Sequence, residues 1–151
     1  VREMIERGYG WAYIYGPPGV GKTLLLQVSV AEAALNGRAA TWIELPDMLG
    51  RLRASFSDHS TEDQVEDWRT VPVLALDEIG RANDTAWAEE VTHRILSQRY
   101  NRSSQERQGI TLFAANYGPS HLPESLLSRI EDKHNGVVLS ITGQDMRRIK
   151  R

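Results

Sequence analysis

The sequence contains no cysteine, which excludes a disulfide scaffold, a thiolate metal site and a cysteine nucleophile. No uninterrupted apolar run approaches the roughly 18 residues that a membrane span needs, and no signal peptide is visible. We therefore expect a cytoplasmic protein with no membrane contact. Charge of neither sign dominates, because 18 basic residues face 20 acidic ones and give a net charge of −2. This balance excludes a strongly basic coat for nucleic acid, although it allows a local basic patch.

The 151 residues, 40% of them hydrophobic, are typical of one folded domain. The sequence begins with Val1, so we expect residues 1–151 to be a single domain taken from a longer protein. The four histidines share no ligand spacing and predict no metal site; they are His59, His93, His121 and His134.

Short apolar runs alternate with amphipathic stretches along the chain. This alternation predicts an α/β fold in which helices cover both faces of a parallel, five-stranded sheet. Thr61 and Gln64 suggest a helical capping box, Asn83 and Asp84 are candidate caps for the longest helix, and residues 101–108 are expected to form a polar loop. We expect strands at 11–15, 39–43, 71–76, 110–115 and 137–141, and helices at 22–36, 46–56, from 61, 85–100, 123–130 and 144–151.

A complete phosphate-loop motif, G-x-x-x-x-G-K-[ST], lies between the first expected strand and a helix. Its glycines let successive backbone N–H groups point at a phosphate, and the helix adds its positive dipole end. We expect Lys22 to reach the β- and γ-phosphates of a nucleotide and the Thr23 hydroxyl to bind Mg²⁺. The alternative is a Gly-Pro turn with an exposed lysine. The motif consists of Gly16, Pro17, Pro18, Gly19, Val20, Gly21, Lys22 and Thr23.

Two carboxylates, Asp77 and Glu78, follow the apolar run 73–76. In a parallel sheet Asp77 would lie beside the phosphate loop and hold Mg²⁺, while Glu78 could take a proton from an attacking water. An Asp alone would suit a kinase or a GTPase, and the added Glu favours an ATPase. The alternative is that both acids merely end a strand.

Three further polar residues are candidates for the same site. Asn116 ends an apolar strand and could orient water or the γ-phosphate, although Asn is also a common turn residue. Arg129, near the end of a helix, could project to the phosphate of a neighbouring subunit, or it could form a surface pair with Asp132. Arg147 could fold back onto its own nucleotide, or be one of several solvated bases in the tail.

Taken in order, these motifs resemble those of the AAA+ ATPases, and within them the DnaC/IstB-like helicase loaders. The resemblance covers nearly the whole chain, and the Ile-Gly pair after the two acids makes it specific. Besides the phosphate loop it rests on residues 76–80 (Leu-Asp-Glu-Ile-Gly), 114–116 (Ala-Ala-Asn), 126–130 (Leu-Leu-Ser-Arg-Ile) and 143–147 (Gly-Gln-Asp-Met-Arg).

The resemblance implies ATP and Mg²⁺ as ligands, and a sheet ordered 5-1-4-3-2. It implies that Asp77 binds Mg²⁺ and Glu78 is the catalytic base. It also implies that Asn116 is sensor 1, Arg129 the finger acting in trans, and Arg147 sensor 2.

The sequence departs from the typical AAA+ pattern in several places. A typical member continues into a helical lid after the last strand, whereas loaders of this family lack it, and we expect no lid here. Met146 stands where the family often has Tyr, and Ser125 stands where some members carry a second arginine. We expect the N-terminal region that binds the partner to lie outside this chain.

Loaders bind single-stranded DNA in the channel of a spiral oligomer, so the resemblance implies three partners: a hexameric replicative helicase, single-stranded DNA, and further copies of the chain in a spiral or ring. Arg51 and Arg53 could neutralise phosphates, while Phe56 or Trp87 could stack on bases. Alternatively, both aromatic residues belong to the core.

We therefore expect an ATPase that loads a replicative helicase. The rivals are an IstB-like transposition helper acting on duplex DNA, and a nucleotide-dependent protein scaffold with little turnover.

Overall fold

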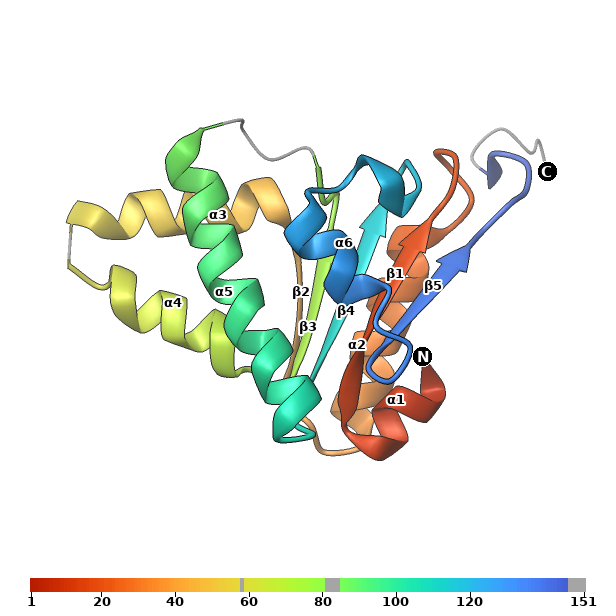
Figure 1. The fold of residues 1–151 in the computed structure, drawn as a ribbon, viewed down its shortest axis with the longest axis horizontal. Coiled ribbons are helices and arrows are strands. Elements are labelled where there is room, and N and C mark those ends of the chain that lie inside the picture. Colours follow the sequence, from red (N-terminus) through yellow and green to blue (C-terminus); the bar gives the residue numbers. More distant parts are fainter. Residues whose placement is uncertain (58, 81–84, 147–151) are drawn as a thin grey trace.

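The computed structural model describes residues 1–57, 59–80 and 85–146, which build one sheet with helices on both of its faces (Figure 1). All four strand pairs are parallel, and the order is β2-β3-β4-β1-β5. This confirms the predicted order 5-1-4-3-2, read from the opposite edge. The strands are β1 (Tyr9–Tyr15), β2 (Ala40–Glu44), β3 (Val73–Asp77), β4 (Gly109–Ala115) and β5 (Gly136–Ser140).

Alternate residues of the strands point to two separate apolar clusters, one on each face of the sheet. On β1, Trp11 and Tyr13 join the cluster beneath α3, α4, α5 and α6, whereas Ala12 and Ile14 join the cluster beneath α1 and α2. The helices are α1 (Arg2–Arg7), α2 (Lys22–Leu35), α3 (Leu45–Ala54), α4 (Thr61–Thr70), α5 (Ala86–Gln105) and α6 (Glu124–Ile130), with short 3₁₀ turns at Ser55–Ser57 and Pro119–His121.

The sheet positions the candidate site, because parallel strands all end at one edge. The phosphate loop leaves the end of β1, the acidic pair lies at the end of β3, and Asn116 follows the end of β4. These three strands are neighbours in the sheet, so motifs far apart in the sequence meet at its carboxyl edge.

The longest helix, α5, continues to Gln105, so the prediction of a polar loop at 101–108 was largely wrong. The extra turn is stabilised by a buried polar contact: Ser103 Oγ donates to Asn135 Oδ1 at 2.6 Å. The N-terminus of α5 also differs from the prediction. Thr85 is the cap and accepts from the backbone N–H of Ala88 at 3.2 Å, while Asn83 and Asp84 lie outside the described residues.

A buried arginine anchors the same helix to the sheet. Arg99 is only 3% exposed and donates to Thr111 Oγ1 at 2.9 Å and to Ile110 O at 2.7 Å on β4. Its other hydrogen bonds reach carbonyls at the end of α4, those of Trp68 at 3.0 Å and Val71 at 2.8 Å. Burial lowers the pKa of Arg99 to about 9, and these oxygens offset part of the cost of burying its charge. The Arg99 guanidinium joins α5 to β4 and to the end of α4, so it is not a candidate residue for the phosphate-binding site.

Three smaller features of the structure also differ from what the sequence predicts. Helix α1 was not predicted. The N-cap position of helix α4 is Ser60, without a side-chain cap bond, one residue before the proposed Thr61, and Thr61 instead accepts a hydrogen bond from Ser55 Oγ at 2.9 Å. Residues 141–146 form no α-helix, so the expected basic helix 144–151 is absent from its described part, and no helical lid follows β5 there. No described helix is both long enough and apolar enough to cross a membrane.

Candidate active site

The phosphate loop folds its backbone around a buried lysine. Gly19 and Gly21 have φ angles of 81° and 93°, which only glycine adopts without strain. Lys22 is 8% exposed, and its Nζ donates to the carbonyls of Gly16 and Pro17, at 2.8 Å in each case. The predicted alternative of an exposed lysine on a simple turn is therefore wrong.

The start of α2, beside the loop, has no side-chain cap. The helix is capped by Gly21, which offers no side-chain acceptor to the first turn. A Cβ at Gly21 would meet no atom within 4 Å, so the space beside the loop is open at this point. Backbone N–H groups at a helix start, together with its positive dipole end, suit a phosphate group.

Two candidate oxygen ligands, from Thr23 and Asp77, meet at the start of α2. Thr23 Oγ1 donates to Asp77 Oδ2 at 2.6 Å, which joins the start of α2 to the end of β3. Asp77 is 4% exposed, and its other oxygen accepts from the backbone N–H of Glu78 at 2.8 Å. A hydroxyl and a carboxylate are hard oxygen donors of the kind Mg²⁺ prefers. These residues therefore fit the predicted magnesium site.

Glu78 has an unusual backbone conformation. Its φ angle is 53°, in the left-handed region that costs a residue with a Cβ about 1–2 kcal/mol. Ile79, the next residue, is held by β4, because its backbone N–H donates to Ala114 O at 3.1 Å. The chain therefore turns sharply between two buried residues, Asp77 and Ile79, and Glu78 is half-exposed at this turn.

Asn116 lies at the same edge but makes no hydrogen bond through its side chain among the described residues. It is exposed and directly follows the end of β4. The strand end is tied to the phosphate loop, because the backbone N–H of Gly16 donates to Ala115 O at 3.4 Å. The structure thus places Asn116 near the loop, and its contact with a γ-phosphate stays a prediction.

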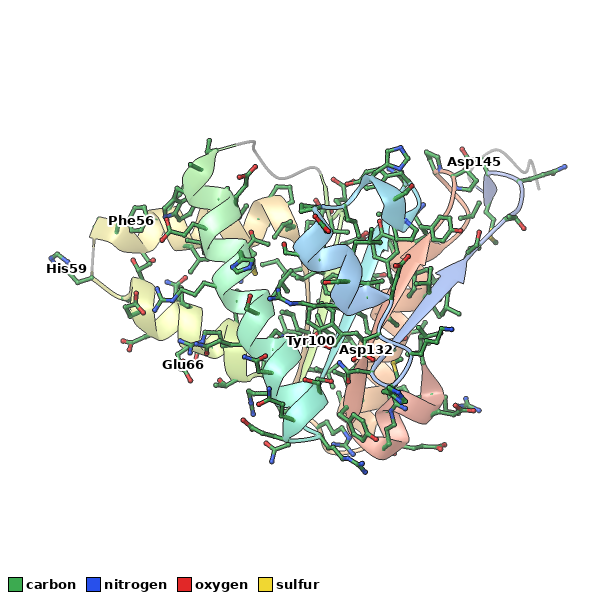
Figure 2. The ribbon with its side chains drawn as sticks, viewed as in Figure 1. Phe56, His59, Glu66, Tyr100, Asp132 and Asp145 are labelled. Carbon is green, nitrogen blue, oxygen red and sulfur yellow. The ribbon has the colours of Figure 1, made fainter. Side chains whose placement is uncertain are left out.

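Arg129 lies on the other face of the sheet from α2. Helix α6 packs with α3, α4 and α5, and the Arg129 guanidinium lies 5.7 Å from the centre of the Tyr100 ring. Asp132 accepts a hydrogen bond from the Tyr100 hydroxyl at 2.8 Å (Figure 2). Among the described residues no ion pair joins Arg129 to Asp132, so that alternative is not observed. Nor does a hydrogen bond or ring contact join Arg129 to residues 16–23.

The segment after β5 covers part of the phosphate loop. The backbone N–H of Ile141 donates to Tyr15 O at 2.7 Å, and that of Met146 donates to Gly19 O at 3.0 Å. A Cβ at Gly19 would overlap the Asp145 carboxylate, so only glycine fits there. Arg147 lies outside the described residues, but the chain leading to it passes directly over the loop.

The four candidate DNA contacts fall on two different surfaces. The Arg53 guanidinium lies 4.9 Å from the centre of the Trp87 ring, and the Phe56 and Trp87 rings meet edge to face at 5.5 Å. Phe56 is 50% exposed, so the core alternative is wrong for it, while Trp87 is partly buried against the core. We call Arg53, Phe56 and Trp87 the aromatic patch. Figure 2 shows Phe56 and Asp145 at opposite ends of the molecule.

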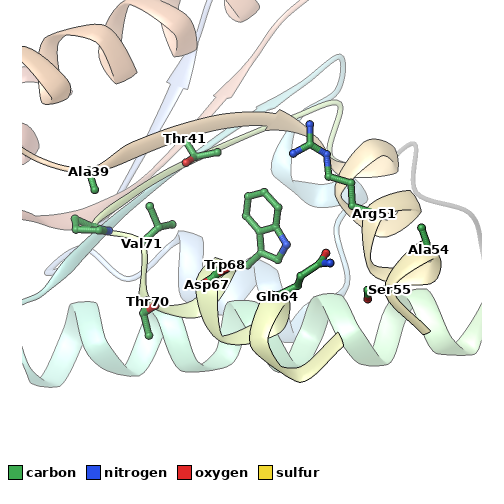
Figure 3. A pocket seen from close by; sticks show the side chains of 11 residues that line it. Ala39, Thr41, Arg51, Ala54, Ser55, Gln64, Asp67, Trp68, Thr70 and Val71 are labelled. Carbon is green, nitrogen blue, oxygen red and sulfur yellow. The ribbon is translucent and has the colours of Figure 1, made fainter. Parts of the chain in front are cut away.

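Arg51 lies on another side of α3. It lines a groove between β2, α3 and α4 together with Trp68 and Gln64 (Figure 3). Residues two apart on a helix do not share a face, which explains why Arg51 and Arg53 separate. The sequence pattern treated them as one basic pair.

A nucleotide-binding strand–loop–helix unit, with an acidic strand end beside it, defines the class of P-loop proteins. Within that class the chain belongs to the AAA family, the "ATPase family associated with various cellular activities", whose family model matches residues 12–136.

Several of the similar proteins are named for roles in DNA replication. The chain is 32% identical over 111 residues to the replicative helicase loader DnaI of Bacillus subtilis (strain 168), which covers 73% of this chain and 34% of DnaI. It is 25% identical over 120 residues to the replicative helicase loader DnaC of Escherichia coli (strain K12), covering 78% of this chain and 47% of DnaC. A solved structure of the replication initiator DnaA, bound to AMPPCP and single-stranded DNA, superposes with a TM-score of 0.79 at 21% identity, covering 95% of this chain and 44% of DnaA. The chain thus spans between a third and a half of the length of these proteins.

Proposed function

We propose that the chain binds ATP with Mg²⁺ and hydrolyses it. The observation that carries this proposal is the pair of Thr23 and Asp77, joined at 2.6 Å beside the buried Lys22. In the proposed complex Lys22 binds the β- and γ-phosphates, while Thr23 and Asp77 hold Mg²⁺. When bound there, Mg²⁺ would supply positive charge to neutralise the phosphates.

Glu78 is the proposed general base. Its half-exposed position at the end of β3, next to the magnesium ligands, lets its carboxylate accept a proton from water. Asn116 is the proposed residue that orients this water or the γ-phosphate. Arg129 is the proposed donor of positive charge to a neighbouring chain, since α6 and α2 lie on opposite faces of one chain's sheet. Arg147 is the proposed sensor 2 residue.

We propose further that the chain is the ATPase domain of a replicative helicase loader in the cytoplasm. It would assemble into a spiral or ring, bind single-stranded DNA and act on a hexameric helicase. The 32% identity to DnaI supports this role. The aromatic patch supports the DNA contact, because a cation over the partly buried Trp87 ring, beside the exposed Phe56 ring, suits phosphate binding with base stacking.

Two rival functions remain distinguishable by one measurement, ATP turnover with no DNA, single-stranded DNA or duplex DNA. We expect turnover without DNA and a change in rate with single strands. A response to duplex DNA alone would favour a transposition helper on the same core. Nucleotide binding without turnover under all three conditions would favour a protein scaffold and would remove the proposed ATPase.

Charge reversal on the two sides of α3 tests the DNA surface. Arg53→Glu is expected to weaken single-strand binding in the presence of ATP, and to lower the slope of log affinity against log salt by about 0.7 or more. Arg51→Glu is the matched control, because it makes the same charge change in the groove of β2 and α4. Fluorescence anisotropy with labelled oligonucleotides, from low to high salt, measures both effects. Equal loss in both variants would mean that the effect comes from net charge and not from the aromatic patch.

A further inference from the structure

The loop that carries Glu78 is held at two points, one on β4 and one just after it. The backbone N–H of Ile79 donates to Ala114 O at 3.1 Å, on β4. The carbonyl of the same residue accepts from the Tyr117 hydroxyl at 2.8 Å. Ile79 is itself 4% exposed. Both polar groups of its backbone are therefore fixed by residues that flank Asn116.

Tyr117 is in turn held from β1. The Tyr13 hydroxyl donates to the carbonyl of Tyr117 at 3.0 Å, and Tyr13 is fully buried in the core beside Phe113. Burial raises the pKa of both phenols above the ordinary value, so both remain protonated donors at neutral pH. The result is a chain of two hydrogen bonds from β1 through residue 117 to the loop after β3.

The sequence of the loop matches this arrangement. A Cβ at Gly80 would overlap the Tyr117 hydroxyl, and Gly80 has a φ angle of 96°. The glycine therefore leaves the room that the hydroxyl needs to reach Ile79. The strained φ of Glu78 persists only if the surrounding structure holds it. The Glu78 N–H is bonded to Asp77 Oδ1, and the contacts on Ile79 hold the chain on the other side.

We infer that Tyr117 is a positioning residue for ATP hydrolysis: its hydroxyl holds Glu78 at the geometry that general-base catalysis requires. This inference rests on the proposed ATPase function. Tyr117 does not touch the reacting atoms in this role. It acts through the backbone of Ile79, and it links the residue that follows Asn116 to the residue that follows Glu78.

The Tyr117→Phe variant tests this inference, because it removes the hydroxyl and keeps the ring. We expect kcat for ATP hydrolysis to fall about tenfold, equivalent to about 1.4 kcal/mol, with nucleotide affinity within about twofold of the parent because the phosphate loop is intact. In the nucleotide-free protein, hydrogen exchange at the amides of residues 78–80 should become faster. Tyr9→Phe is the control, since the Tyr9 hydroxyl makes no hydrogen bond among the described residues.

Further variants distinguish positioning from general stability. Tyr13→Phe should lower kcat in the same direction by a smaller factor, and the double variant should be no slower than Tyr117→Phe alone, because the two bonds act in series. Unchanged kcat, unchanged exchange at 78–80, or a loss of nucleotide affinity equal to the loss of kcat would each overturn the inference. Absence of turnover in the parent protein would instead refute the proposed function, and the exchange measurement would still test the contact.

Discussion

A Lys22→Ala variant is expected to bind ATP about 10²- to 10⁴-fold more weakly than the parent, since it loses two charge-assisted hydrogen bonds to phosphate worth about 1.5–3 kcal/mol each. The lysine is suited to this task because its amine is already buried within the loop, bonded to the carbonyls of Gly16 and Pro17. Isothermal titration with a non-hydrolysable ATP analogue and Mg²⁺ measures the loss.

Glu78→Gln is the matched variant for this experiment. It keeps the shape of the side chain and cannot accept a proton, so it should bind ATP like the parent and lose about 10²- to 10⁴-fold in turnover. Parent-like affinity in Lys22→Ala would refute the phosphate-loop assignment. Parent-like turnover in Glu78→Gln would remove Glu78 from the mechanism and leave the binding site unaffected.

Arg129→Ala is expected to lower ATP turnover about 10³-fold or more, with little effect on ATP binding, if its charge acts on a neighbour's phosphate. Its position on α6, across the sheet from α2, favours that neighbour over its own nucleotide. Mixing this variant with Glu78→Gln should recover part of the activity. In such mixed oligomers the first chain offers an intact pocket and the second offers an intact arginine.

The recovery should saturate as association completes, so the oligomeric state is measured beside turnover, for instance by light scattering. DNA, helicase and any preceding region are included where the parent protein needs them to assemble. If the parent assembles and the mixture stays inactive, Arg129 acts within its own chain or only through its contact with Tyr100.

The family resemblance predicted the sheet order, and the motifs predicted which residues meet at its carboxyl edge, because both depend on short motifs in a fixed order; the roles of those residues stay predictions. The phosphate loop fixed the end of β1, and the buried apolar run before Asp77 marked β3. The meeting of Thr23 and Asp77 then follows from parallel strands that end at a common edge. The two motifs are local sequence patterns, and the parallel sheet brings them together at its carboxyl edge.

Features that depend on distant partners were not predictable in this way. Residues 101–105 have a polar composition typical of a loop, yet α5 continues through them because Ser103 finds Asn135. The role of Tyr117 has no sequence signal, since its partner carbonyl lies 38 residues earlier. The positive φ of Glu78 had no sequence signal either, and the distant contact beside it is the bond from Ile79 to Ala114 on β4.

Arg99 anchors α5 to β4, so a tilt of the helix about this point would move its N-terminal end. Trp87 lies twelve positions before Arg99 on the same rod, about 18 Å away along the helix axis. A tilt of about 5° around this anchor would move the Trp87 end by roughly 1.6 Å at that radius. A rotation of α5 about Arg99 would thus displace the aromatic patch more than the anchored part of the helix.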